Sequence, residues 1–396
     1  RVELKPSQMS RFSCRLKEVK GKPRIERRME PQLTLKSDIS EVVISGETGL
    51  LESYQVNGID FLKPGSLRLL VVEDYPDPWG MLVRSFREVK GAFALMSKEE
   101  CAAFSGVSSS ELEPVRIIED GPVRTVVEAL FKYNHSFVCQ RYKIPKKGSE
   151  FELEVRVFWN EKDRMLKLLV PTLFSNGSCI GQVAYGVEQF KRMGEELVAQ
   201  KWVGMVSEDK RLAFTVINSG TYGFDYHRGE LRLSLLRSAA YSAHPVGKGI
   251  PLVPQDRFEP RIDQGERIFH FWINGGKAEH RILQIDREAL AKNESVMALF
   301  CFPPGNGKRI LPGVLLSDNI IQITALKMAE EKNWLIIRLF EPTGEKRKTR
   351  VMIPSLNLRF DISFKGFEIK SMAVDLATKD IFEVDLMERK LSEEGR

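Results

Sequence analysis

The residues best suited to acid–base chemistry are two carboxylates on either side of a glycine turn. Asp263 and Glu266 bracket Gly265, directly before an alternating run of apolar and polar residues. Two carboxylates beside one sugar ring can act as acid and base, and their separation sets the stereochemical outcome. The alternative is a turn in which Asp263 caps backbone N–H groups and Gly265 supplies a positive φ. Because the sequence shows no complete site around them, we expect a supporting, ligand-binding role and no direct catalysis.

Two further segments carry side chains that suit the recognition of vicinal hydroxyl groups. Arg237 ends an otherwise apolar strand, where its rigid guanidinium either pairs with a buried carboxylate or projects toward a ligand. Tyr222 and Asp225 lie in the segment Tyr-Gly-Phe-Asp-Tyr, which offers aromatic faces and a carboxylate. The alternative for this turn is that its rings pack into the core, since aromatic side chains bury large areas.

An acidic loop braced by prolines supplies the remaining candidates. Asp74 and Trp79 lie within Glu-Asp-Tyr-Pro-Asp-Pro-Trp, and Pro76 and Pro78 stiffen this loop. A stiff loop suits accurate contact with a neighbour, although a solvated surface crossing has the same composition. The complete set of expected substrate-binding residues is Asp74, Trp79, Tyr222, Asp225, Arg237, Asp263 and Glu266. We expect no catalytic residue and no metal ligand in this chain.

Composition and charge exclude several classes of protein. The 396 residues are 42% hydrophobic and 29% charged, as in soluble globular proteins of two or three domains. The net charge of +6 comes from scattered residues without a basic stripe, so we expect no nucleic-acid partner. The apolar runs are strand-sized, so we expect no membrane association. Five widely spaced cysteines without a C-x-x-C pair favour a reducing, cytoplasmic location.

Alternating apolar and polar residues predict that β-strands dominate the fold. In residues 151–159 every second side chain is apolar and the intervening ones are mostly charged, which is typical of a half-buried antiparallel strand. Further strands are expected at 42–45, 67–73, 124–132, 214–218, 268–273, 335–341 and 367–375. Helices are expected to be few and short, with a capping box of Ser97 and Glu100 opening one of them. The expected class is therefore all-β, with a large antiparallel sandwich.

Shifts in pattern and composition predict the domain organisation. The chain begins at Arg1 within an alternating pattern, so we expect a truncated or processed chain in which residues 1–24 are the tail of a preceding β-domain. Residues 25–285 are expected to form the large sandwich. A Pro- and Gly-containing stretch favours a linker at 286–304, and residues 305–396 are expected to form a smaller β-sandwich.

Several short motifs follow one another between about residues 30 and 375. Among them are Glu-Asp-Gly-Pro-Val-Arg at 119–124, Phe-Glu-Leu-Glu-Val with the residues that follow at 151–171, and Tyr-Gly-Val-Glu at 185–188. Ile-Thr-Ala-Leu-Lys at 323–327 and Ile-Arg-Leu-Phe-Glu at 337–341 come later. Each motif is weak alone, but in this order they resemble the C-terminal β-region of glycoside hydrolase family 38, the α-mannosidases.

The resemblance implies a catalytic α/β barrel and a helical bundle, followed by β-domains of which the largest is a galactose-mutarotase-like supersandwich. It implies retaining cleavage of α-mannosides by a carboxylate nucleophile, an acid/base carboxylate and a zinc ion. The family's His-x-Asp and His-His-Asp metal motifs do not occur here, where the five histidines are isolated. We therefore expect no cofactor in this segment and zinc in the missing N-terminal catalytic domain. The sequence departs from the family pattern at Arg267, where histidine is frequent, and at Gly80, which replaces a carboxylate.

The expected function is thus the C-terminal β-portion of a retaining, zinc-dependent α-mannosidase-like glycoside hydrolase, which supports the barrel and lines the rim of the sugar pocket. The segment alone is expected to be inactive. Its expected partners are an α-mannoside or related glycan, the N-terminal catalytic domain and, in a homo-oligomer, a second copy. One alternative is a stand-alone carbohydrate-binding or scaffolding supersandwich. Another is an aldose epimerase that uses His270 and Glu266, four residues apart on an alternating strand.

Overall fold

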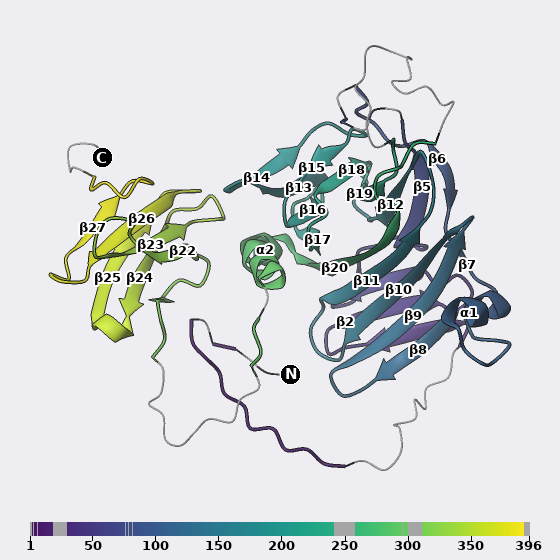
Figure 1. Cartoon of the computed structure of the whole chain (residues 1–396), viewed down its shortest axis with the longest axis horizontal. Coiled ribbons are helices and arrows are strands. Elements are labelled where there is room, and N and C mark those ends of the chain that lie inside the picture. Colours follow the sequence, from purple (N-terminus) through teal and green to yellow (C-terminus); the bar gives the residue numbers. More distant parts are fainter. Residues whose placement is uncertain are drawn as a thin grey trace. The chain divides into compact units, whose positions relative to one another are not determined.

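The chain divides into two compact units that each form their own core (Figure 1). The computed structural model describes residues 2, 4–5, 7–18, 30–75, 77, 79–80, 82–240, 258–294, 296–299 and 311–391. The larger unit comprises residues 23–183 and 188–285, and the smaller unit comprises residues 1–22, 184–187 and 286–396. Helix α2 (Ala278–Asn293) crosses the division between the two units.

Three sheets build the larger unit. The ten-stranded sheet has the order β14 (Gly186–Phe190), β13 (Ser178–Val183), β16 (Trp202–Val206), β17 (Leu212–Asn218), β20 (Gly265–Lys277), β11 (Phe151–Trp159), β10 (Ser136–Pro145), β9 (Arg124–Tyr133) and β7 (Ala94–Leu95), and β8 (Val115–Asp120) also pairs with β9. The six-stranded sheet has the order β15 (Leu197–Val198), β18 (Gly223–His227), β19 (Glu230–Arg237), β12 (Arg164–Pro171), β5 (Arg68–Glu73) and β6 (Val89–Ala92). A four-stranded sheet contains β1 (Gln32–Lys36), β2 (Ser40–Ser45), β3 (Leu51–Val56) and β4 (Ile59–Asp60).

One hydrophobic core lies between these sheets. It joins Leu33 of β1, Val155 of β11 and Leu168 of β12 with their inward-facing neighbours. Strand β11 shows how the sequence produces this arrangement, because its burial alternates residue by residue along its whole length. Its neighbours β10 and β20 both run antiparallel to it. The expected all-β class with a large antiparallel sandwich is confirmed.

A short helix covers part of the outer face of the ten-stranded sheet. Helix α1 (Lys98–Ser105) begins with the expected capping box, in which Ser97 and Glu100 bond to each other's backbone N–H groups. Its Cys101 packs with Leu130 of β9 and Cys139 of β10 in a small apolar cluster. Figure 1 shows α1 beside β8 and β9. Burial raises the pKa of the Cys101 thiol to about 11, as for a thiol that stays protonated in an apolar cluster.

The smaller unit is a compact β-sandwich. One sheet contains β21 (Leu315–Leu316), β24 (Arg347–Ile353) and β25 (Leu358–Phe364), and the other contains β22 (Gln322–Met328), β23 (Trp334–Phe340), β26 (Ile369–Asp375) and β27 (Ile381–Val384). A 3₁₀ turn, η1 (Pro354–Leu356), joins β24 to β25. Ile337 and Leu339 of β23, Val351 of β24 and Val374 of β26 meet in its core. The smaller β-sandwich expected after the large one is therefore also confirmed.

The domain boundaries drawn from the sequence at residues 24, 285 and 304 stay a prediction. Within the segment expected as a linker, residues 286–293 are helical because they belong to α2. The described residues among 1–24 form no strand. No helix in the described part of the chain is long and apolar enough to cross a membrane.

Candidate functional site

A pocket opens on the outer face of the six-stranded sheet. This face is defined by β12, whose Leu166 and Leu168 point into the main core while Met165 points the other way, onto Phe86. The segment after β5 crosses this face and encloses a cavity of about 560 Å³. We call this cavity the Arg237 pocket; its polar lining includes Arg84, Arg192, Glu195, Glu196, Arg237 and Asp263.

Arg237, at the end of β19, is paired with the buried carboxylate of Asp74. Its Nη2 and Nε donate to Asp74 Oδ1 at 2.6 and 3.1 Å, and Nη2 also donates to the carbonyl of Asp77 at 3.0 Å. The guanidinium lies over the ring of Phe86, 4.8 Å from its centroid. Of the two roles expected for Arg237, pairing with a buried carboxylate is therefore the one observed, and the side chain still lines the pocket.

Asp74 has unused hydrogen-bonding capacity beside this pocket. Its side chain is fully buried, and Oδ2 has no hydrogen-bond partner among the described residues. Burial raises the pKa of Asp74 above its ordinary value, and the Arg237 guanidinium only partly offsets this effect. A buried acceptor without a partner is costly, so the geometry favours a donor at this position.

Two further candidates are Asp263, which bonds to the backbone of Arg237, and Trp79, which lies on the loop after β5. Asp263 adopts a φ of 55°, and its Oδ2 accepts the backbone N–H of Arg237 at 3.2 Å. The turn role that the sequence offered as an alternative is thus present, and Asp263 also lines the pocket. Trp79 is 71% exposed on the loop after β5. That loop is shaped by Asp77, whose Oδ2 accepts the backbone N–H groups of Leu82 and Val83.

Asp225 is enclosed beneath the pocket by cationic side chains. Lys167 and Asp225 are both fully buried, and Lys167 Nζ donates to Asp225 Oδ2 at 2.5 Å. The other carboxylate oxygen of Asp225 accepts from Arg87. Lys167 Nζ also donates to Glu196 Oε2 at 2.5 Å, which joins this buried pair to the pocket lining. Both oxygens of Asp225 therefore have protein partners, and its contact with substrate stays a prediction.

Tyr222 directly precedes a residue that lines the same pocket. Its side chain is exposed, and its carbonyl accepts the backbone N–H of Ala199 at 3.0 Å. The next residue, Gly223, lines the pocket. By contrast Phe224 and Tyr226 are buried in the main core, as the alternative interpretation of this turn expected.

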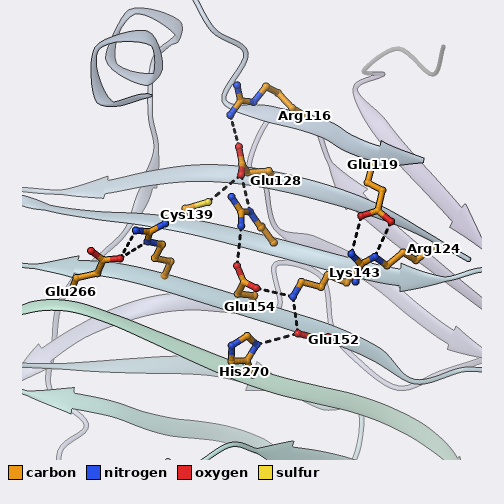
Figure 2. A network of polar contacts seen from close by, with 12 residues as sticks. Arg116, Glu119, Arg124, Glu128, Cys139, Lys143, Glu152, Glu154, Glu266 and His270 are labelled. Carbon is orange, nitrogen blue, oxygen red and sulfur yellow. Dashed lines mark hydrogen bonds and ion pairs between the residues drawn. The ribbon is translucent and has the colours of Figure 1, made fainter. Parts of the chain in front are cut away.

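Glu266 lies on a different sheet from the other candidates. Its side chain projects from the outer face of the ten-stranded sheet, where it accepts from Arg156 at 2.5 Å (Figure 2). Asp263 lines the Arg237 pocket and Glu266 does not, although only two residues lie between them in the chain. Figure 2 also shows His270 on this face, where its Nδ1 lies 3.1 Å from Glu152 Oε1. Because His270 is paired with Glu152, the epimerase pair of His270 and Glu266 is not formed.

Sequence reasoning missed an ion-pair network on the outer face of the ten-stranded sheet (Figure 2). Arg141 joins Glu128 to Glu154, and Lys143 Nζ contacts Glu154 and Glu152 at 2.7 and 2.8 Å. Burial opposes ionisation of Glu152, but His270 and Lys143 outweigh it and lower its pKa to about 2. The signal was available, because the outward positions of β11 carry glutamates opposite the basic outward positions of β10.

The described residues contain one cluster of side chains that could hold a metal ion. Among them, one group of His, Cys, Asp and Glu side chains brings its ligand atoms together, namely Glu152, Glu154 and His270. Lys143 already places its ammonium against both carboxylates of this group. The group is therefore an ion-pair cluster in which the Lys143 ammonium offsets the negative charge of the two carboxylates.

Comparisons with known proteins agree with the fold. The profile of the glycosyl hydrolases family 38 C-terminal domain matches residues 35–246, and that of the family 38 C-terminal beta sandwich domain matches residues 321–395. No curated protein matches the chain significantly.

Two solved structures from Enterococcus faecalis share the fold. One is an α-mannosidase from strain V583, with a TM-score of 0.64 and 14% identity over 85% of this chain and 41% of its own. The other is described as a protein in glycosyl hydrolase family 38, with a TM-score of 0.66 and 14% identity over 85% of this chain and 43% of its own. The chain therefore spans about two-fifths of the length of these proteins.

Proposed function

This chain belongs to glycoside hydrolase family 38, and from that premise we propose that it is the C-terminal β-portion of a retaining, zinc-dependent α-mannosidase-like enzyme. Within that enzyme it supports the catalytic domain and lines the rim of the sugar pocket. The nucleophile, the acid/base carboxylate and the zinc ion belong to the catalytic domain. The residues of this chain bind the sugar substrate and orient it.

The observation that carries the proposal is that exposed apolar side chains adjoin, along the chain, several residues that line the Arg237 pocket. Gly80, Val83, Arg192 and Gly223 line this pocket. Large apolar side chains next to them in the chain are exposed, namely Trp79, Leu82, Met193 and Tyr222. Contiguous exposed apolar surface around polar groups is typical of a surface that another domain or a ligand covers.

The polar lining of the Arg237 pocket suits an uncharged, hydroxylated ligand. The lining holds the guanidinium groups of Arg84, Arg192 and Arg237 and an equal number of carboxylates, those of Glu195, Glu196 and Asp263. Asp74 is not among the lining residues, but its Oδ1 holds the Arg237 guanidinium in place at the pocket. Hydroxyl groups can donate to such carboxylates and accept from the guanidinium groups.

The direct test compares this chain with the native gene product on an aryl α-mannoside. We expect the native product to be several hundred residues longer, as the two-fifths coverage suggests, and to lose activity when a chelator removes zinc. The 396-residue chain should show no turnover. Turnover by this chain that is abolished in Asp263→Asn would refute the assignment of catalysis to another domain.

The rim role is tested by substitutions in the native product. Trp79→Ala and Arg84→Ala should raise KM severalfold and change kcat less, because they remove binding contacts and no reacting group. Both side chains are exposed, so their loss should leave the fold intact. Val123→Ala, an exposed apolar change in the turn between β8 and β9, is the control. A native product that begins near Arg1 and binds sugars saturably without a partner would instead favour a stand-alone carbohydrate-binding protein.

A further inference from the structure

A second pocket lies on the outer face of the ten-stranded sheet, next to α1. It has a volume of about 440 Å³, within the range of roughly 300–1,000 Å³ that small-molecule pockets span. Helix α1, the turn between β9 and β10, the end of β11 and the start of β20 all contribute to its lining. We call it the aromatic pocket; none of its lining residues belongs to the Arg237 pocket.

Three phenylalanine rings give this pocket a flat apolar wall. The ring of Phe104 stacks on Phe137 with centroids 5.2 Å apart and meets Phe158 edge-on at 5.5 Å. All three side chains are only half-buried, although the cluster beneath them that contains Cys101 is closed. The Arg156 guanidinium covers part of the Phe158 ring, 5.3 Å from its centroid. The phenyl surface that stays exposed is costly in water, which favours a ligand that covers it.

Planar polar side chains surround the rings. His135 and Asn160 are exposed, and within the described part of the chain their side chains have no hydrogen-bond partner. Gln264 uses its amide nitrogen on the carbonyl of Glu161, which leaves its amide oxygen available. The negative charge of Glu266 is offset by Arg156. The rim thus offers both donors and acceptors without an uncompensated charge.

We infer that the aromatic pocket is a second sugar-binding site, which takes the pyranose ring of a neutral glycan. A pyranose ring presents C–H groups on its faces, which suit the phenyl wall, and hydroxyl groups around its edge, which suit the polar rim. A lipid tail would leave the rim side chains without partners, and a charged ligand would meet no opposing free charge. This site gives Glu266 a role in binding that does not require it to lie near Asp263.

Fluorine NMR of the whole chain labelled with 5-fluorotryptophan can test this inference site by site. The chain has five tryptophans, of which Trp159 is buried in the main core at the edge of the aromatic pocket and Trp79 is next in the chain to a residue of the Arg237 pocket. The probes are methyl α-D-mannopyranoside and methyl β-D-glucopyranoside. We expect at least one of them to shift the Trp159 signal saturably, with the signal assigned by comparison with Trp159→Phe.

Two substitutions separate the polar and the apolar parts of the site. Asn160→Ala removes an exposed side chain without a described partner, so it should preserve the fold and raise the dissociation constant at least fivefold. Phe158→Ala should have at least as large an effect. Arg84→Ala, in the other pocket, should leave the titration of Trp159 unchanged.

The inference would be overturned if neither probe shifted the Trp159 signal. It would also be overturned if the dissociation constant were unchanged in both Asn160→Ala and Phe158→Ala. A third contrary result would be that Arg84→Ala alone abolished the sugar-induced shift of Trp159. None of these results bears on the α-mannosidase proposal, because that proposal rests on the family matches and the Arg237 pocket and is tested by the activity of the native product.

Discussion

Replacing Lys167 by methionine is expected to destabilise the larger unit strongly. Lys167 and Asp225 are fully buried on the outer face of the six-stranded sheet, with Nζ and Oδ2 2.5 Å apart. Methionine fills a similar volume but carries no charge. The substitution leaves the Asp225 carboxylate buried with Arg87 as its remaining cation, and Glu196 loses its cation as well.

The magnitude follows from the cost of an uncompensated buried charge. Breaking a buried ion pair from one side costs about 3–5 kcal/mol in free energy of unfolding. Because Arg87 still contacts Asp225, we expect the lower end, about 3 kcal/mol. In a unit of this size 1 kcal/mol shifts Tm by about 2–4 °C, so the expected fall in Tm is about 6–12 °C.

Differential scanning calorimetry of the whole chain measures this shift, with a surface pair as the control. Arg124 and Glu119 are paired at 2.9 Å in the same unit, but their side chains are 44% and 43% exposed. Arg124→Met should therefore cost at most about 1 kcal/mol. A further change, Asp225→Asn in the Lys167→Met background, should restore part of the loss because it removes the unpaired charge. Equal Tm shifts in Lys167→Met and Arg124→Met would refute the reasoning.

The remaining predictions concern other parts of the chain. The pKa of Glu152 is lowered, so its ionised form stabilises the fold above pH about 4.3, and this stabilisation is lost as the pH falls toward 2. The Tm of Glu152→Gln should therefore lie furthest below that of the unchanged chain at pH 7, and the difference should narrow by pH 3. A difference in Tm that does not change with pH would contradict this prediction. Gly275→Ala should cost about 1–3 kcal/mol in urea unfolding, because its Cβ would lie 2.7 Å from the Phe61 ring, while Gly276→Ala, with no such contact, should cost less. Glu341→Gln should destabilise the smaller unit by about 2 kcal/mol, measured by calorimetry, because the buried carboxylate accepts several backbone N–H groups; an unchanged transition would show that these bonds contribute nothing.

The strands were predictable because burial on one face of a sheet imposes a period of two. Residues 151–159 form a strand whose buried and outward positions alternate throughout, and residues 230–235 do the same before Leu235 and Leu236, which are both buried. The helix at 97–104 was predictable from its capping box, because that signal is local. Helix α2 differs from the expectation, because residues 286–293 belong to the segment that was predicted as a linker.

The candidate site was predictable in its residue types and only partly in its arrangement. Arg237 and Asp74 are 163 residues apart, so their pairing depends on the order of strands in the sheet and leaves no local signal. The separation of Asp263 from Glu266 follows from the turn at Gly265, whose φ of 113° redirects the chain as β20 begins. A single lysine within the apolar strand 164–171 was a signal for the buried Lys167 that went unused.

The position of β20 sets a lower limit on the length of a fragment that can fold into the larger unit. Strand β20 is the last of the larger unit in sequence, yet it lies in the interior of the ten-stranded sheet and pairs with β17 on one side and β11 on the other. During synthesis the two halves of this sheet cannot pair through β20 until residues 265–277 have been made. Until then each half has an unpaired edge that can bind other chains. The first family match ends at residue 246, before β20 begins. A fragment cut at that boundary is therefore expected to aggregate, so the sequence that defines the family is shorter than the sequence that can fold.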